Sequence, residues 1–152
     1  MPLPKPAAHI HVKQLTALPP GQSQATLKQI NFELKPGQAM GVIGPSGAGK
    51  SSLARVLSGV WLPAAGQVRL GGATLDQYGA DVLGQHVGYL PQRVELFEGT
   101  IGENIAGLIQ NPDANNIVAA AKKAGAHNMI LNLANGYDTK VSASSDHLSG
   151  GQ

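Results

Sequence analysis

The sequence predicts an α/β fold in which a glycine-rich loop joins a short strand to a helix. The chain has 152 residues, of which 20 are glycine and 42% are apolar, enough for one domain with a core. Residues 38–43 form a short apolar run that is typical of a strand covered on both faces. A glycine-rich turn follows, and residues 50–58 then have a helical pattern that ends at Gly59.

The other strands are predicted from alternation and turn residues. Residues 9–15 and 30–34 alternate partly between apolar and polar side chains, which is the pattern of half-buried strands. Residues 67–70, followed by a glycine pair, predict one arm of a hairpin, and residues 87–90 predict a second buried strand. Residues 1–6 are rich in proline and predict an extended lead-in.

From residue 96 onward the pattern becomes helical. Thr100 and Glu103 have the spacing of a capping box, which predicts a helix start. Residues 111–124 predict a second helix, with Asn111 as its cap, a proline in the first turn and then an acid at the positive end of the dipole. Residues 126–133 predict a third, short helix.

Composition excludes several classes of protein. The 11 basic and 9 acidic residues nearly balance, and only 4% of residues are aromatic, so we expect no nucleic-acid partner. The chain has no cysteine, which excludes disulfides and thiolate metal sites. The apolar runs are too short to span a bilayer or to form a signal peptide.

Residues 44–51, GPSGAGKS, fit the pattern G-x-x-x-x-G-K-[ST] without a mismatch. Glycines allow successive backbone N–H groups to turn toward phosphate oxygens, and the helix N-terminus adds partial positive charge. In this pattern Lys50 reaches the β- and γ-phosphates, and the Ser51 hydroxyl ligates Mg²⁺. The alternative, a chance glycine-rich turn, is disfavoured by the order of strand, loop and helix. The motif therefore predicts binding of a nucleoside triphosphate.

Three further strings follow in order along the chain: YLPQ at residues 89–92, LFEGTIGENIA at residues 96–106 and LSGGQ at residues 148–152. Together they resemble motifs of the ATPase domain of ABC transporters. YLPQ resembles the Q-loop, and LFEGTIGENIA resembles the start of the helical subdomain of exporters. LSGGQ at residues 148–152 spells the ABC signature.

Most of the chain resembles one branch of that family, the type I secretion exporters. MPLP, PPG, GVIGPSGAGKSSLAR, VGYLPQ, VELFEGTIGENIA, VAAAKKAG and GYDT carry this resemblance. It implies a P-loop NTPase (RecA-like) core with a parallel sheet, an antiparallel β subdomain and a helical subdomain, truncated after the signature. The implied domains are a linker at 1–8, the ATP-binding core with the β subdomain at 9–98, and the helical subdomain at 99–152.

The resemblance assigns roles to single residues. Lys50 and Gln92 are the expected catalytic residues, and Ser51 and Gln92 the expected metal contacts. Ser149, Gly150 and Gly151 are expected to bind the γ-phosphate held by the opposite subunit. The expected ATP–Mg²⁺ contacts within the chain are Gly44, Pro45, Ser46, Gly47, Ala48, Gly49, Lys50, Ser51 and Ser52.

The resemblance also implies partners and a location. We expect a head-to-tail homodimer with two ATP molecules between the subunits, joined to the transmembrane domain of the same exporter. Membrane-fusion and outer-membrane channel proteins are further expected partners, at the cytoplasmic face of the bacterial inner membrane. The complete protein is expected to be an ATPase. These 152 residues lack the Walker B aspartate and the water-activating glutamate, so they are not expected to hydrolyse ATP efficiently alone.

Other interpretations remain open at this stage. The chain could belong to a lipid or drug exporter, or act only in binding. A soluble ABC ATPase of DNA repair would carry a long coiled coil between Lys50 and Leu148, and this interval is too short for one. His9 and His11 share one face of a strand, but a surface strand is a simpler interpretation than a metal site. The sequence also departs from the family: residues 15–20 hold no aromatic for adenine, and Ala143 stands where an acid is expected.

Overall fold

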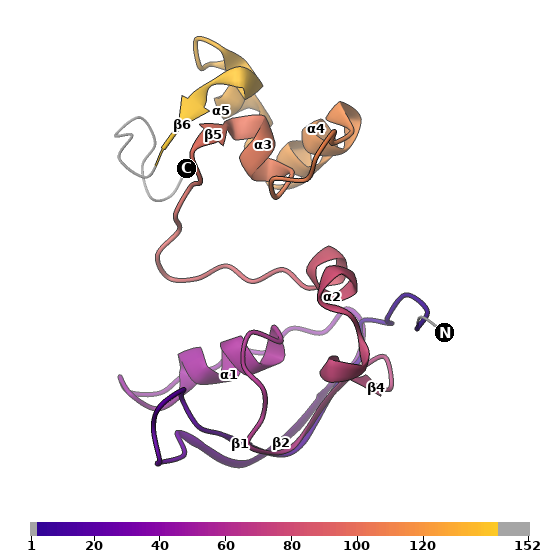
Figure 1. The fold of residues 1–152 in the computed structure, drawn as a ribbon, viewed down its shortest axis with the longest axis vertical. Coiled ribbons are helices and arrows are strands. Elements are labelled where there is room, and N and C mark those ends of the chain that lie inside the picture. The colour runs from indigo at the N-terminus through magenta and orange to yellow at the C-terminus, as the bar shows by residue number, and fades with distance from the viewer. Residues whose placement is uncertain (1–2, 143–152) are drawn as a thin grey trace. The chain divides into compact units, whose positions relative to one another are not determined.

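The computed structural model describes residues 3–142, which form two compact units. The first unit comprises Met1–Tyr89 and the second Leu90–Gln152. Figure 1 shows strands and helices in both units, so the predicted α/β class is confirmed. The sequence-based domain limits at 1–8, 9–98 and 99–152 stay a prediction.

The first unit is built on a four-stranded antiparallel sheet. Its strands are β1 (Ile10–Ala17), β2 (Leu27–Leu34), β3 (Ala65–Leu70) and β4 (Ala73–Thr74), in the order β2-β1-β3-β4. Helix α1 (Lys50–Leu57) contacts β1, and a 3₁₀ turn (Leu75–Gln77) leads from β4 to α2 (Ala80–His86). The predicted hairpin after residue 70 is therefore confirmed.

A bulge in β1 explains why its alternation is only partial in the sequence. Val12 and Leu15 are both buried although they stand three positions apart, an offset that places two residues on opposite faces of a regular strand. The register of β1 against β2 shifts between these two residues, and Gln14 has a φ of 49°. The extra residue turns both apolar side chains to the same face.

That face forms the core of the unit together with α1. Leu53 and Val56 of α1 pack in the same buried cluster as Val12 and Leu15. Tyr78 is buried at the edge of this cluster, and its hydroxyl donates a hydrogen bond of 2.7 Å to the carbonyl oxygen of Leu70. This packing against the sheet fixes the position of α1 and of the loop before it.

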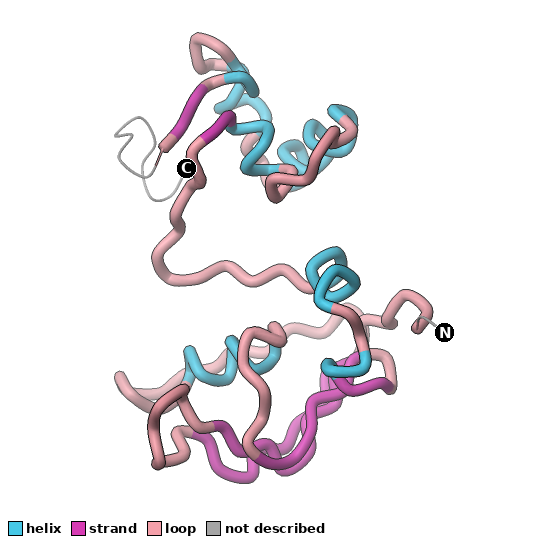
Figure 2. Tube along the Cα trace, in the orientation of Figure 1, coloured by secondary structure: helices cyan, strands magenta, loops and turns pink. Residues whose placement is uncertain are grey.

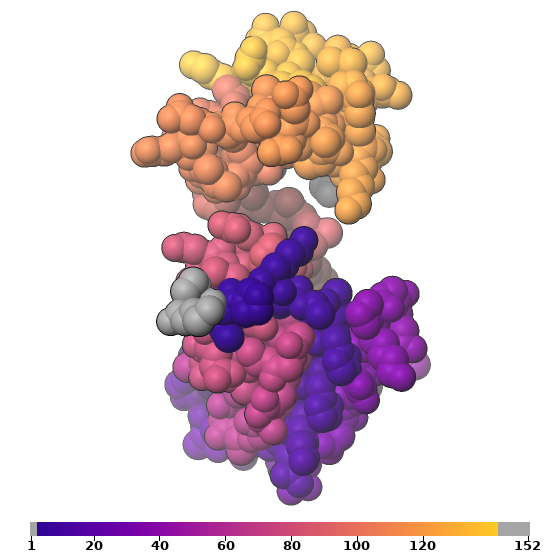
Figure 3. All heavy atoms as spheres, turned by 90° about the vertical axis from the view of Figure 1, so that its right-hand side faces the viewer, coloured from indigo at the N-terminus to yellow at the C-terminus, as the bar shows by residue number. Residues whose placement is uncertain are grey.

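The lead-in segment lies against the β3–β4 turn. The backbone N–H of Gly71 donates to the carbonyl oxygen of His9 at 2.8 Å. The indigo N-terminal segment covers part of this unit in the space-filling view (Figure 3).

Two predicted strands are not formed. Residues 38–43 and 87–90 are drawn as loop in Figure 2, and Ile43 and Leu90 are 95% and 80% exposed. An apolar run becomes a strand only where neighbouring strands take up its backbone hydrogen bonds. Within residues 3–142 every paired strand is antiparallel, as predicted for the antiparallel β subdomain, and these residues form no parallel pair.

The second unit is mainly helical. It contains β5 (Gly99–Thr100), α3 (Ile101–Ile105), α4 (Ala114–Lys123), α5 (His127–Leu131), a 3₁₀ turn (Gly136–Asp138) and β6 (Lys140–Val141). β5 and β6 pair antiparallel. Its core is a buried cluster of Ile101, Ala121, Ile130 and Val141.

The predicted start of α3 is correct, whereas the predicted cap of α4 is not. The capping box is confirmed: Thr100 Oγ1 accepts from Glu103 N at 3.1 Å, and Thr100 N donates to Glu103 Oε2 at 2.7 Å. The predicted cap of α4 is wrong. Asp113 is the cap, because its carboxylate accepts from Asn115 N at 2.8 Å, whereas Asn111 has a φ of 54° two residues earlier. Among the described helices, none has the length and apolar character needed to cross a membrane.

Candidate functional site

The phosphate-binding motif forms an exposed loop that ends at the first turn of α1. Gly47 and Gly49 adopt left-handed conformations, with φ of 81° and 89°. Gly49 is the residue that caps α1, and its carbonyl oxygen accepts the first helical hydrogen bond, from Leu53 N at 2.9 Å. The loop therefore delivers its backbone amides to the positive end of a helix dipole, where an anion is stabilised.

Lys50 closes the loop from within. Its Nζ donates hydrogen bonds of 2.7 Å to the carbonyl oxygens of both Gly44 and Pro45. A further backbone bond, from Ala48 N to Pro45 O at 3.3 Å, tightens the turn. The ammonium group is thus held over the loop, where the sequence motif requires it to meet phosphate oxygens.

The loop also rests on the β1–β2 connection. A Cβ on Gly49 would lie 2.8 Å from Leu27 Cδ2 and 2.9 Å from the carbonyl oxygen of Thr26. Only a glycine fits this approach, which fixes the start of α1 against the sheet. Sequence reasoning missed Thr26 and Leu27, because no local signal links them to a glycine more than 20 residues away.

The two serines after Lys50 face different surroundings. Ser51 is exposed, whereas Ser52 is only 8% exposed. The Ser51 hydroxyl is therefore the accessible one, which the proposed contact with Mg²⁺ requires. Pro45, Ser46 and Ala48 also lie exposed on the loop.

The remaining predicted site residues lie elsewhere in the chain. Gln92 is exposed in the segment that follows Leu90, within the second compact unit. Ser149, Gly150 and Gly151 fall outside the described residues. The phosphate loop is thus the part of the predicted site that the structure assembles.

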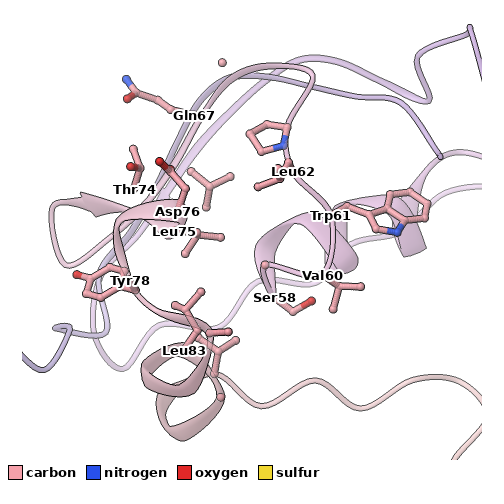
Figure 4. Close-up of a pocket in the computed structure, with 17 residues that line it drawn as sticks. Ser58, Val60, Trp61, Leu62, Gln67, Thr74, Leu75, Asp76, Tyr78 and Leu83 are labelled. Carbon is pink, nitrogen blue, oxygen red and sulfur yellow. The ribbon is translucent and has the colours of Figure 1, made fainter. Parts of the chain in front are cut away.

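The first unit also contains a cavity of about 580 Å³ next to the C-terminal end of α1. Figure 4 shows Trp61, Leu75 and Leu83 around it, with Asp76 beside Leu75. Of the described residues that line it, Asp76 carries the one ionisable acid, and none is basic. Because that surface is apolar and carries an acid, this cavity does not suit a triphosphate.

The histidines do not form a metal centre in residues 3–142, where no group of three or more His, Asp or Glu side chains could hold an ion. His9 Nε2 instead lies 2.6 Å from Glu33 Oε1 across the β1–β2 pair. A carboxylate can only accept, so Nε2 carries the proton. This hydrogen bond lowers the pKa of Glu33 below its ordinary value.

Trp61 and His127 have structural contacts. The Arg55 guanidinium lies 4.9 Å from the centroid of the Trp61 ring, which packs against the core of the first unit. Nδ1 of His127 lies 2.8 Å from the Tyr137 hydroxyl in the second unit. Trp61 is thus a core contact of the first unit, and His127 has a contact within the second.

Comparison with known protein families shows that residues 27–152 match the family described as ABC transporter. The type I secretion system ATP-binding protein PrsD of Rhizobium meliloti (strain 1021) is 49% identical over 150 residues, which are 99% of this chain and 26% of that protein. The mycobactin import ATP-binding/permease protein IrtA of Mycolicibacterium smegmatis (strain ATCC 700084 / mc(2)155) is 43% identical over 128 residues, 83% of this chain and 14% of that protein.

A solved structure supports the same grouping. The structure of a bacterial Atm1-family ABC exporter with ATP bound matches with a TM-score of 0.80 and 30% identity, covering 99% of this chain and 27% of that chain. The chain spans only 26% of the length of PrsD and 14% of the length of IrtA.

Proposed function

Because the chain belongs to the ABC transporter family, we propose that its phosphate loop binds ATP with Mg²⁺ and that the complete protein couples ATP hydrolysis to export. The resemblance predicted from the sequence is confirmed at the level of the family and of an exporter ATP-binding domain. The observation that carries the proposal is the loop itself, with Lys50 Nζ bonded to the Gly44 and Pro45 carbonyls at the start of α1.

The residues present fit a triphosphate. The left-handed glycines turn the loop, the N-terminus of α1 supplies partial positive charge, and Lys50 supplies a full one. When phosphate oxygens enter, Lys50 Nζ exchanges its two carbonyl acceptors for charged ones, which form stronger hydrogen bonds. Bound Mg²⁺ would neutralise phosphate charge, and the exposed Ser51 hydroxyl would hold it.

The other roles are part of the same proposal. Gln92 would contact the metal or the attacking water, and Ser149, Gly150 and Gly151 would bind the γ-phosphate on an opposite subunit. The partners are then a second copy of this domain, arranged head to tail, and the transmembrane domain of the exporter. Membrane-fusion and outer-membrane channel proteins would complete the system at the bacterial inner membrane.

We propose protein export by a type I secretion system as the transport activity. PrsD, which matches over nearly the whole chain at 49% identity, supports this branch. Relatives of other kinds match at 37–43% identity over shorter parts, among them IrtA and the antigen peptide transporter 1 of Rattus norvegicus. An exporter of another cargo is therefore the second candidate.

Calorimetric titration of Mg–ATP into the chain tests the binding step. The chain is expected to bind, and Lys50→Ala is expected to weaken binding by about tenfold or more, because a hydrogen bond to a charged group is lost. Lys35→Ala is the matched control, since Lys35 is exposed in the turn after β2. Equal affinities of Lys50→Ala and the unaltered chain would contradict the proposal.

A further inference from the structure

The cavity of about 580 Å³ beside the C-terminal end of α1 lies wholly within the first unit. Every described residue that lines it falls between Ser58 and Val87. Its walls come from the segment after α1, from β3, from the 3₁₀ turn after β4 and from α2. Small-molecule sites in proteins occupy roughly 300–1,000 Å³ and are concave in this way. The cavity therefore has the size of a ligand site.

The walls of this cavity are largely apolar. Val68 and Leu75 are buried and belong to the core cluster of the first unit. Val60 and Leu62 also line the cavity, but they remain 61% and 74% exposed. Figure 4 shows Leu62, Leu75 and Leu83 around the open space. Because exposed apolar surface is stabilised when it is covered, the cavity favours a ligand with an apolar body.

One carboxylate differs from the other polar groups of the cavity. The Ser58 hydroxyl donates to the carbonyl oxygen of Arg55 at 3.1 Å. The Tyr78 hydroxyl donates to the carbonyl oxygen of Leu70 at 2.7 Å. The Asp76 carboxylate, in contrast, has no hydrogen-bond or ion-pair partner among the described residues, and none of those that line the cavity is basic. Its charge is complementary to that of a cation.

We propose that this cavity binds a small organic cation, a molecule with an apolar body and one ammonium group. The apolar walls cover the body, and the Asp76 carboxylate accepts hydrogen bonds from the ammonium group. Because Asp76 is exposed, this ion pair sets the preference for a cation, while the apolar walls supply most of the affinity. The inference does not rest on the proposed binding of ATP, since the phosphate loop lies at the opposite end of α1.

Three probes with one common apolar body test the preference: 4-phenylbutylamine, 4-phenylbutanol and 4-phenylbutanoate. Calorimetric titration into the whole chain gives their dissociation constants, and the fluorescence of Trp61, which lines the cavity, reports the same event. The amine is expected to bind about fivefold tighter than the alcohol, which is the upper range for an exposed ion pair, and the acid more weakly than the alcohol. No binding of the amine, or binding no tighter than that of the alcohol, would overturn the inference and leave the proposed function intact.

The variant Asp76→Asn tests the role of the charge. It should reduce the affinity of the amine to that of the alcohol and leave the alcohol unchanged, because asparagine keeps the shape of the side chain and loses its charge. Asp81→Asn is the matched control, since Asp81 is exposed in α2 and does not line the cavity. A preference for the amine that persists in Asp76→Asn would contradict the proposed ion pair.

A variant that fills the cavity tests the place of binding. Gly84 lies in α2 and lines the cavity, and a Cβ added to it meets no atom within 4 Å. Gly84→Leu is expected to weaken all three probes by about fivefold or more, and leucine favours a helix more than glycine does. Gln85→Leu, at an exposed position outside the lining, is the matched control and should bind normally.

A second variant covers the case in which Gly84→Leu does not fold. Leu62→Gln removes apolar surface at an exposed position of the wall, so it too should weaken all three probes. Unchanged binding of the amine in a folded Gly84→Leu, or in Leu62→Gln where that variant replaces it, would mean that the probe binds elsewhere and would overturn the inference.

Discussion

Two glycines of the phosphate loop are left-handed for different physical reasons. Gly47 has a φ of 81° with no atom within 4 Å of an added Cβ, so its requirement is purely conformational. Gly49 has a φ of 89° and also packs on Leu27 and on the Thr26 carbonyl. The first glycine shapes the loop, whereas the second fixes the loop to the sheet.

Alanine at these two positions is expected to have unequal effects on stability. Gly47→Ala should lower the free energy of unfolding by about 1 kcal/mol, the cost of a left-handed alanine. Gly49→Ala should cost about 2–3 kcal/mol, because the added Cβ also meets a backbone carbonyl that cannot move away. Urea unfolding followed by the fluorescence of Trp61, the one tryptophan of the chain, measures both. Equal losses would show that Leu27 and Thr26 yield freely.

Glu33 predicts a pH dependence of the first unit. The hydrogen bond from His9 holds the pKa of Glu33 below its ordinary value of 4.5, with smaller contributions from the nearby His11 and Lys35. A lowered pKa in the folded state stabilises the fold above the unfolded value, and this stabilisation is lost as the pH falls through the folded value. Glu33→Gln should therefore be less stable than the unaltered chain at pH 7.

That difference should shrink as the pH falls below 4.5 and vanish once Glu33 is protonated in the folded state. Urea unfolding of both proteins at several pH values measures it. Glu95→Gln, at an exposed position in the second unit, reports the effect of losing one negative charge elsewhere. A difference that stays constant down to the most acidic pH would contradict the assignment.

At the scale of elements, side chains near α3 organise the segment before it. The Thr100–Glu103 capping box starts the helix, and Asn104 adds a clamp that the sequence analysis missed. Asn104 Oδ1 accepts from Phe97 N at 2.8 Å, while Nδ2 donates to the carbonyl oxygens of Phe97 and Thr100 at 3.0 and 2.9 Å. The cap had a known spacing, but the clamp depends on how residues 97–100 fold back on the helix.

Removing the cap should loosen α3 locally. Thr100→Ala is expected to cost about 1 kcal/mol, because the N–H of Glu103 loses its acceptor. Hydrogen exchange of that amide, followed by NMR, should be faster in Thr100→Ala and close to normal in Thr100→Ser, which restores the hydroxyl. Protection unchanged in Thr100→Ala would mean that the Asn104 clamp alone holds the helix start.

At the scale of the whole molecule, local signals predicted α1, α3, α4, α5 and the phosphate loop, whereas α2 was not predicted and the pairing of distant segments limited the prediction of strands. α1 and α3 were predicted because their start signals lie within a few residues. The segments at 38–43 and 87–90 were predicted as strands from apolar character alone, but a strand needs a partner that no local pattern reveals. The bulge at Gln14 and the contact of Gly49 with Thr26 likewise arise between distant residues. The sequence motif therefore predicted the phosphate loop, but not the contacts of Gly49 with Thr26 and Leu27 that support it.

The division into two compact units predicts where a protease cuts first. The units divide between Tyr89 and Leu90, and Arg93 is exposed without regular structure just after that point. Proteases favour such exposed segments. Lys5 and Lys35 also lie in loops, but each precedes a proline, which blocks trypsin. Most other basic residues of the described chain lie in strands or helices.

Brief treatment with trypsin should therefore release fragments 1–93 and 94–152, identified by mass spectrometry. Arg93→Gln should remove this early cut and leave later ones unchanged, because glutamine is not a trypsin site. Each unit has its own buried cluster, so the two fragments should be cleaved further only more slowly than the chain is first cut at Arg93. A first cut within α1 or α4 would instead mean that one of these units opens more readily than the segment that joins them.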